Sequence, residues 1–254
     1  KNLVAGSRYR PLSIATFAIQ HELHGLNPTP FHIGNILFYL ITALIAMRLF
    51  YLLLPPPSKN KKWFLAASFM AAVFFVAHPV HTEVVANIKG RDEIMGLLFS
   101  LASLYFALRH LEYQKWLDLI WMSLCFMLGL LAKENAITFL AVVPLAFWFY
   151  SKSSFKRYFK TLWPLLVVTV LYLLIRYSVI GFLIDSGNEI VDPMNNPFVE
   201  MTTGQFSSTV LFTLGKYLRL LVFPHPLVHD YYPYAVPIMR SEEHTSELQS
   251  PSAI

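Results

Sequence analysis

The chain has 254 residues, of which 56% are hydrophobic and only 14% are charged, and its mean hydropathy is +0.50. A water-soluble domain carries about a quarter charged residues, so the composition excludes that class and predicts an integral membrane protein. The net charge of +5 does not indicate a nucleic-acid partner, because the lysines cluster in short loops where a cytoplasmic positive bias explains them. Cys125 is the only cysteine, which excludes a disulfide framework.

The apolar segments predict an all-α fold, a polytopic membrane helical bundle, in four parts. Residues 1–30 are expected to end an external loop and form a juxtamembrane amphipathic helix. Residues 31–182 form a transmembrane core of about six spans. Residues 183–239 hold an external loop, an interfacial helix and a Pro- and Tyr-rich segment.

Neither end of the chain looks native. Residues 240–254 contain RSEEHTSELQS, which resembles a translated sequencing adapter, so this tail is excluded from the fold. The chain begins at Lys1 without an initiator methionine. We therefore expect a fragment of a longer protein.

The lysine-rich loops at 58–62 and 151–160 orient the bundle, because cytoplasmic loops carry an excess of positive charge. With these loops inside, the unusual polar groups fall at external helix ends, and most of them belong to the stretch HPVHTEVVANIKGRDE at 78–93. Ionisable groups at such positions are costly and usually functional. The set comprises His78, His81, Glu83, Arg91, Asp92, Glu93, Lys133, Glu134 and Arg176. The sequence thus predicts one external site.

Three cations from different segments, Arg91, Lys133 and Arg176, can converge on one anion near the membrane surface. A lipid phosphate suits that depth, and both arginine and lysine bind phosphate oxygens. The alternative is that each side chain snorkels or pairs locally, Arg91 with Asp92 and Lys133 with Glu134.

The acids and histidines of the stretch carry a second hypothesis. Glu83 is a candidate general base, with His81 and Asp92 as further catalytic candidates. Glu83 with His78 or His81 could also hold a divalent cation, Mg or Mn. The HxxH spacing is a weak metal signal, and His81 or Thr82 capping a helix explains it equally well. Acids in a first helical turn, such as Glu93, need no catalytic role.

Several segments together resemble a known family. YRPLS, FHIGNILFYL, HPVHTEVVANIKGRDE, LLAKENAIT, LIRYSVIG and LLVFPHPLVHDYY occur in matching order. They resemble the transmembrane and tetratricopeptide-repeat O-mannosyltransferases and their bacterial relatives, which belong to the GT-C glycosyltransferases. The resemblance covers nearly all of residues 7–239.

The resemblance implies a polyprenyl- or dolichyl-phosphate sugar as donor, such as the mannose form, and transfer to a protein Ser or Thr hydroxyl. It places the chemistry on the periplasmic side of a bacterial inner membrane or the lumenal side of the endoplasmic reticulum. Members carry their main acidic pair just before YRPLS, so Glu83 is expected to be the second acid and the fragment to be inactive alone. Tyr9, Arg10, His78 and Glu134 are expected to support the site.

Two alternatives stay open. One is a GT-C transferase with another lipid-linked sugar or with a lipid or glycan acceptor. The other is a non-enzymatic lipid-headgroup transporter or scaffold. A transporter is expected to show paired inverted repeats and charges at the bilayer midplane, whereas the charges here collect at one face. The sequence therefore favours the enzyme.

Overall fold

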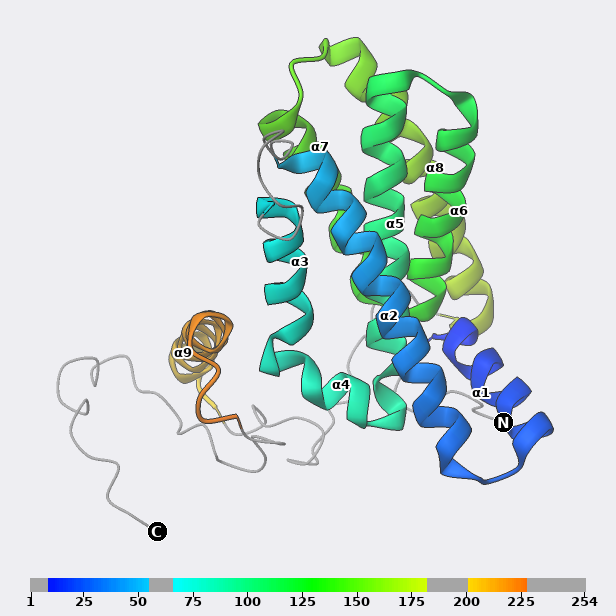
Figure 1. The fold of residues 1–254 in the computed structure, drawn as a ribbon, viewed down its shortest axis with the longest axis vertical. Helices are drawn as coiled ribbons and strands as arrows, with labels where there is room; N and C mark the ends of the chain where they lie inside the picture. Colours follow the sequence, from blue (N-terminus) through cyan, green and yellow to red (C-terminus); the bar gives the residue numbers. More distant parts are fainter. Residues whose placement is uncertain (1–8, 55–65, 182–200, 228–254) are drawn as a thin grey trace, which may run out of the picture. The chain divides into compact units, whose positions relative to one another are not determined.

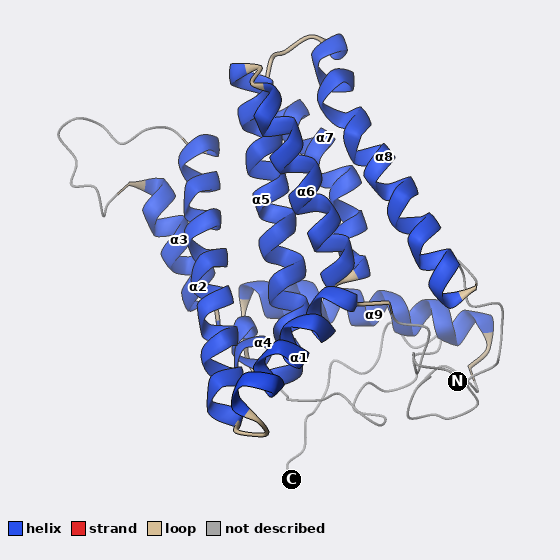
Figure 2. Ribbon diagram, turned by 90° about the vertical axis from the view of Figure 1, so that its right-hand side faces the viewer, coloured by secondary structure: helices blue, strands red, loops and turns tan. Residues whose placement is uncertain are grey.

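The computed structural model describes residues 9–54, 66–181 and 201–227. Every regular element within these ranges is a helix (Figure 2). The chain divides into two compact units, residues 1–184 and residues 185–254. The first unit contains eight labelled α-helices and holds all the candidate site residues.

Two proline-started helices open the first unit. Helix α1 (Pro11–His24) begins with proline at its first position, where the missing N–H costs nothing. Helix α2 (Pro28–Leu53) starts three residues before the expected span, because the Asn27 side chain accepts a hydrogen bond from the Thr29 amide at 3.1 Å. It ends before Leu54, whose extended backbone (φ −101°, ψ 152°) is typical of a residue that precedes proline.

The stretch at 78–93 is a series of short helical turns. Helix α3 (Ala67–Ala77) leads into η3 (Pro79–His81), α4 (Thr82–Ala86) and η4 (Ile88–Gly90). The axis turns by 45° between α3 and the segment Pro79–Ala86. The polar groups of the stretch are therefore held by hydrogen-bonded backbone at the end of the bundle.

The remaining helices build the core around α5. Helix α5 (Arg91–Tyr113) packs along α6 (Trp116–Ala132) and also contacts α2, α7 (Phe139–Tyr150) and α8 (Phe155–Ile180). Between α6 and α7 lies η5 (Glu134–Thr138). Of the most apolar window of α5, 61% is buried, against 17% for α2 and for α8. Helix α5 is thus the inner helix, and α2 and α8 present apolar faces to lipid.

The structure confirms an all-α membrane bundle. Helices α2 and α8 and the segment Ile88–Tyr113 are long and apolar enough to cross a membrane, and α3 with Pro79–Ala86 makes a fourth span if the bent pair is counted. The segments Trp116–Ala132 and Glu134–Tyr150 are shorter apolar helices. Each of the six expected spans thus corresponds to a helix, while the count of six crossings stays a prediction.

The second unit contains α9 (Thr203–Val222) among its described residues. A capping box starts it: the Thr202 side chain accepts from the Gln205 amide, and the Gln205 side chain accepts from the Thr202 amide. Residues 182–200 and 228–254 lie outside the described ranges. Most of the expected external loop, the Tyr-rich segment and the adapter-like tail fall there.

Candidate functional site

One end of the first unit gathers the polar elements. The ends of α1, α5 and α6 meet there with η3, α4, η4 and η5 (the lower end in Figure 1). The expected external groups of the stretch at 78–93, together with Lys133 and Glu134, all lie on these elements. The charged residues of this stretch, with Lys133 and Glu134, are therefore brought to one end of the bundle.

Arg10 links three elements at this end. Its guanidinium donates two hydrogen bonds to Glu134, from Nε at 2.8 Å and from Nη2 at 2.6 Å, and a third bond goes to Asp92. These bonds raise the pKa of Arg10 and lower that of Glu134 to about 2. The α1 hydroxyl of Ser13 adds a bond to the Ala132 carbonyl at 3.1 Å. These hydrogen bonds thus join the start of α1 to α5, α6 and η5.

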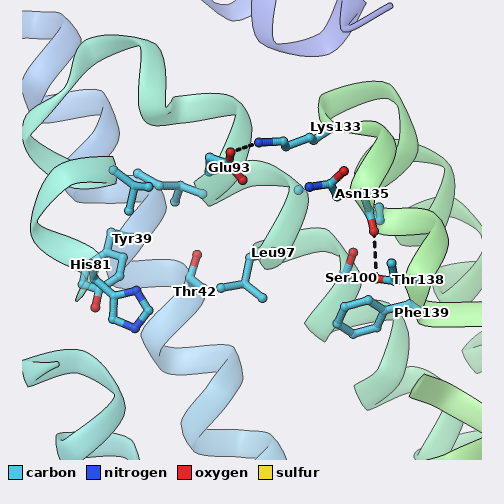
Figure 3. A pocket seen from close by; sticks show the side chains of 14 residues that line it. Tyr39, Thr42, His81, Glu93, Leu97, Ser100, Lys133, Asn135, Thr138 and Phe139 are labelled. Atoms are coloured by element: carbon cyan, nitrogen blue, oxygen red, sulfur yellow. Dashed lines mark hydrogen bonds and ion pairs between the residues drawn. The ribbon is translucent and has the colours of Figure 1, made fainter. Parts of the chain in front are cut away.

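Lys133 pairs with Glu93 across the gap between η5 and the first turn of α5 (Figure 3). The lysine is 9% exposed, whereas the Glu93 side chain is 45% exposed. The sequence offered two local pairs, Lys133 with Glu134 and Arg91 with Asp92. The Lys133 charge helps to lower the pKa of Glu134, while the close contact of Lys133 is with Glu93 and Arg91 donates to Asn35. Helix packing thus brings Lys133 to a carboxylate that is distant in sequence, and Arg91 to neutral oxygen atoms.

Two cavities meet at this ion pair. The first, of about 310 Å³, lies between α2, η3, α5 and η5 and is largely apolar, with side chains such as Leu97 and Phe139 (Figure 3). The second, also about 310 Å³, is polar and includes Arg10, Glu83 and Lys89. Val84, Glu93 and Lys133 line both. The pair therefore stands where an apolar cavity joins a polar one.

Arg91 lies deeper and binds within the protein. It is fully buried, and it donates from Nε to Asn35 Oδ1 and from Nη2 to the Phe31 carbonyl, both at 2.9 Å. A longer bond of 3.4 Å joins Nη1 to Thr16. The guanidinium carbon also sits 4.3 Å from the centre of the Phe17 ring. This geometry suits a residue that joins α1, α2 and α5, and direct contact with a phosphate stays a prediction.

Arg176 and Tyr9 both lie near Tyr172 of α8. The Tyr9 ring packs against Tyr172 of α8, with centroids 6.3 Å apart, and Arg176 follows one helical turn after Tyr172. Arg176 lines neither of the two cavities, whereas Lys133 lines both. The convergence of all three predicted cations on one anion is thus not seen in this arrangement.

The histidines have different neighbours. His78 Nδ1 accepts from the Val80 amide at 3.2 Å and so caps η3, whereas the caps expected of His81 and Thr82 are not formed. His81 lies between the Phe75 and Tyr39 rings, with centroid distances of 4.8 and 5.7 Å, and faces the apolar cavity (Figure 3).

The sequence also predicted that Glu83, with His78 or His81, could hold a divalent cation. Among the described residues, no group of three or more His, Cys, Asp and Glu side chains could hold one. Glu83 is exposed and lines the polar cavity, while the His78 ring nitrogen Nδ1 is engaged with the backbone. The Mg or Mn site expected from the sequence stays a prediction.

Sequence reasoning missed several members of the site. Asn35 is fully buried inside α2, and its side-chain amide donates to the Asn87 carbonyl at 3.0 Å while its oxygen accepts from Arg91. A buried asparagine in an apolar span is a signal that could have revealed it. Lys89 of the polar cavity was visible within the same stretch but was given no role.

Comparison with known proteins gives relatives of one kind. The chain is 34% identical to Protein O-mannosyl-transferase TMTC2 of Mus musculus over 139 residues, which is 53% of this chain and 16% of the relative. It is 37% identical to TMTC4 of Homo sapiens over 147 residues, 53% of this chain and 20% of the relative. Protein O-mannosyl-transferase F38B6.6 of Caenorhabditis elegans matches 88% of this chain at 29% identity, and 30% of that relative is covered.

The chain spans less than a third of the length of these relatives. No family model and no solved structure matches it. The chain is thus similar to TMTC proteins, which are named protein O-mannosyl-transferases.

Proposed function

We propose that the chain is the membrane part of a GT-C glycosyltransferase that moves a sugar, mannose in the working model, from a polyprenyl- or dolichyl-phosphate donor to a protein Ser or Thr hydroxyl. The observation that carries the proposal is the Lys133–Glu93 pair, which lines both an apolar and a polar cavity. The names of the relatives support the reaction class.

The two cavities match the two halves of such a donor. An isoprenoid chain is apolar and fits the first cavity, which opens among membrane helices, while the sugar fits the polar cavity. The phosphate between them would lie at Lys133, which then exchanges the Glu93 carboxylate for phosphate oxygens. A cation at that place stabilises the negative charge that develops on the leaving phosphate.

The reaction forms a bond between the acceptor oxygen and the anomeric carbon and breaks the bond from that carbon to the phosphate. The acceptor proton passes to a carboxylate, and the polyprenyl phosphate leaves with the bonding electrons. The polar cavity has two exposed acids, Glu83 and Glu93. Glu93 is paired with Lys133, so Glu83 is our candidate for orienting the acceptor. The endoplasmic reticulum lumen, or the periplasm in a bacterial relative, is the proposed side.

Donor binding by the reconstituted chain tests this proposal. A polyprenyl phosphate is titrated into nanodiscs that carry the wild type, Lys133→Ala, Lys133→Arg or Lys115→Ala. Lys115 lies at the opposite end of the bundle and is the matched control. We expect Lys133→Ala to weaken binding at least tenfold, Lys133→Arg to retain most of it, and Lys115→Ala to match the wild type.

Equal binding by Lys133→Ala and the wild type would overturn the phosphate assignment. Thermal melting in the same nanodiscs separates lost binding from lost fold. Mannosyl transfer by the full-length gene product with Glu83→Gln then tests the acceptor side, where an unchanged turnover number contradicts a role for that acid.

A further inference from the structure

A third cavity lies at the opposite end of the first unit. It measures about 350 Å³ and lies where the last turn of α2, the last turns of α5 and the connection from α7 to α8 come together. The glycosyl-transfer proposal uses none of these residues. The cavity therefore needs an explanation of its own.

The walls of this cavity are of two kinds. Four leucines from α2 and α5 form an apolar side. Ser151, Lys152, Ser153 and Arg157 form a polar side with two cations, while Glu112 is the one acid among the lining residues. Lys152 and Arg157 are both exposed. Their side chains can therefore move to a ligand without breaking a buried contact.

Hydrogen bonds within the protein preorganise the polar side of the cavity. The Tyr158 hydroxyl lies 2.9 Å from the Ser151 carbonyl oxygen and 3.2 Å from that of Phe147, so it ties the connection to the end of α7. The Tyr158 and Phe147 rings also pack, with centroids 5.5 Å apart. Ser151 Oγ accepts from the Ser153 amide at 3.1 Å. The connection is a shaped, hydrogen-bonded turn.

The positive charge at the start of α8 favours the binding of an anion. Helix α8 begins at Phe155 with no acidic residue in its first turn and no side-chain cap from Ser154. Its first residues include Lys156 and Arg157, which stand at the positive end of the helix dipole, where cations are disfavoured. A phosphate in the adjoining cavity would reduce this repulsion.

The surroundings place the cavity at the level of lipid headgroups. Phe149, Tyr150 and Phe155 flank the turn and are 68%, 56% and 82% exposed. Exposed aromatic side chains at the end of membrane helices are typical of the membrane–water interface. Basic pockets between membrane helices at this level bind anionic headgroups.

We propose that this cavity binds the headgroup of an anionic phospholipid, with the phosphate held by Lys152 and Arg157 and the first acyl carbons against the leucines. The site is separate from the donor site and does not depend on the glycosyl-transfer proposal. The positive-inside expectation places it in the cytoplasmic leaflet, which is rich in anionic lipid.

The test is lipid titration into the reconstituted full chain, with phosphatidylglycerol as ligand and phosphatidylcholine of the same acyl chains as comparison. The pocket variant is Lys152→Ser with Arg157→Ser. The matched control is Lys156→Ser with Lys160→Ser, which removes the same charge from residues of α8 that do not line the cavity. Binding is read as lipid retention in native mass spectrometry, and melting in phosphatidylcholine checks the fold.

We expect one tightly held phosphatidylglycerol per chain, a loss of about 30-fold in affinity in the pocket variant, and a change of less than about threefold in the control. Equal losses in the two variants would show diffuse surface attraction and overturn the proposal. Retention of phosphatidylcholine as tight as phosphatidylglycerol would also overturn it. Displacement of the lipid by millimolar inorganic phosphate would assign the site to free phosphate instead.

Discussion

Arg10 and Glu134 are joined by two parallel hydrogen bonds although 124 residues separate them in the chain. A planar guanidinium facing a carboxylate in this way gives both strength and a defined geometry. The same guanidinium also binds Asp92. The entry of α1 into the bundle is therefore tied to the start of α5 and to η5 by one side chain.

Replacing Arg10 tests this link. In Arg10→Met the carboxylates of the buried Asp92 and the partly buried Glu134 lose their partner, so we expect the free energy of unfolding to fall by about 2 kcal/mol. Arg10→Lys restores less than half of the loss, because lysine cannot bond both oxygens in the same plane. Thermal melting in detergent measures both, and a melting temperature equal to the wild type in Arg10→Met would contradict the link.

The same pair predicts a pH dependence. Hydrogen bonds from Arg10 lower the pKa of Glu134 to about 2 from the ordinary 4.5. A depressed carboxyl pKa stabilises the fold fully above the unfolded-state value and loses this contribution as the pH falls towards the folded-state value. The melting temperatures of the wild type and Glu134→Gln should therefore differ by a constant amount above about pH 5 and converge between about pH 4.5 and 2. A difference in melting temperature that grows as the pH falls would contradict this prediction.

Gly90 is expected to tolerate no side chain. A Cβ at this position would lie 2.3 Å from the Val84 carbonyl oxygen, which belongs to the backbone of α4. Gly90→Ala should therefore cost about 2 to 3 kcal/mol and displace α4 with Glu83. Gly215→Ala is the control, since nothing lies within 4 Å of its added carbon. Alanine favours the helix at this position of α9, so its melting temperature should not fall below that of the wild type.

Arg91→Lys separates two roles for this residue. If Arg91 joins α1, α2 and α5, the lysine loses the bonds to Asn35 and to the Phe31 carbonyl, and the melting temperature falls with or without donor. If Arg91 instead binds the donor phosphate, the melting temperature in the absence of donor stays near that of the wild type and donor affinity drops. The observed bonds of 2.9 Å lead us to expect the first result, with a loss of about 3 kcal/mol.

Much of the fold could be predicted from the sequence, because helix starts, proline stops and apolar lengths are local signals. Pro11 opens α1, and α2 ends before the run that begins at Pro55. The gathering of charges at one end also followed from the alternation of spans. Helix bounds differed by a few residues where a side chain intervened, as Asn27 does at the start of α2.

The partners of the charges could not be predicted in the same way. Sequence neighbours suggested Lys133 with Glu134, yet Lys133 pairs with Glu93, and Glu134 pairs with Arg10. Which carboxylate a cation meets depends on how α5, α6 and α1 pack, and that is a property of the whole bundle. Asn35 was missed for a related reason: it acts through hydrogen bonds with two residues more than 50 positions away in the chain.

The buried Arg91 network has a consequence for how the protein is made. The ribosome releases the Asn35 amide and the Phe31 carbonyl long before the guanidinium that binds them, which lies 56 residues after Asn35. Until α5 is in place, the Asn35 side chain in α2 lacks its partners Asn87 and Arg91. A nascent chain that stops before α5 is therefore expected to carry an unpaired amide in an apolar helix, which is costly in a membrane.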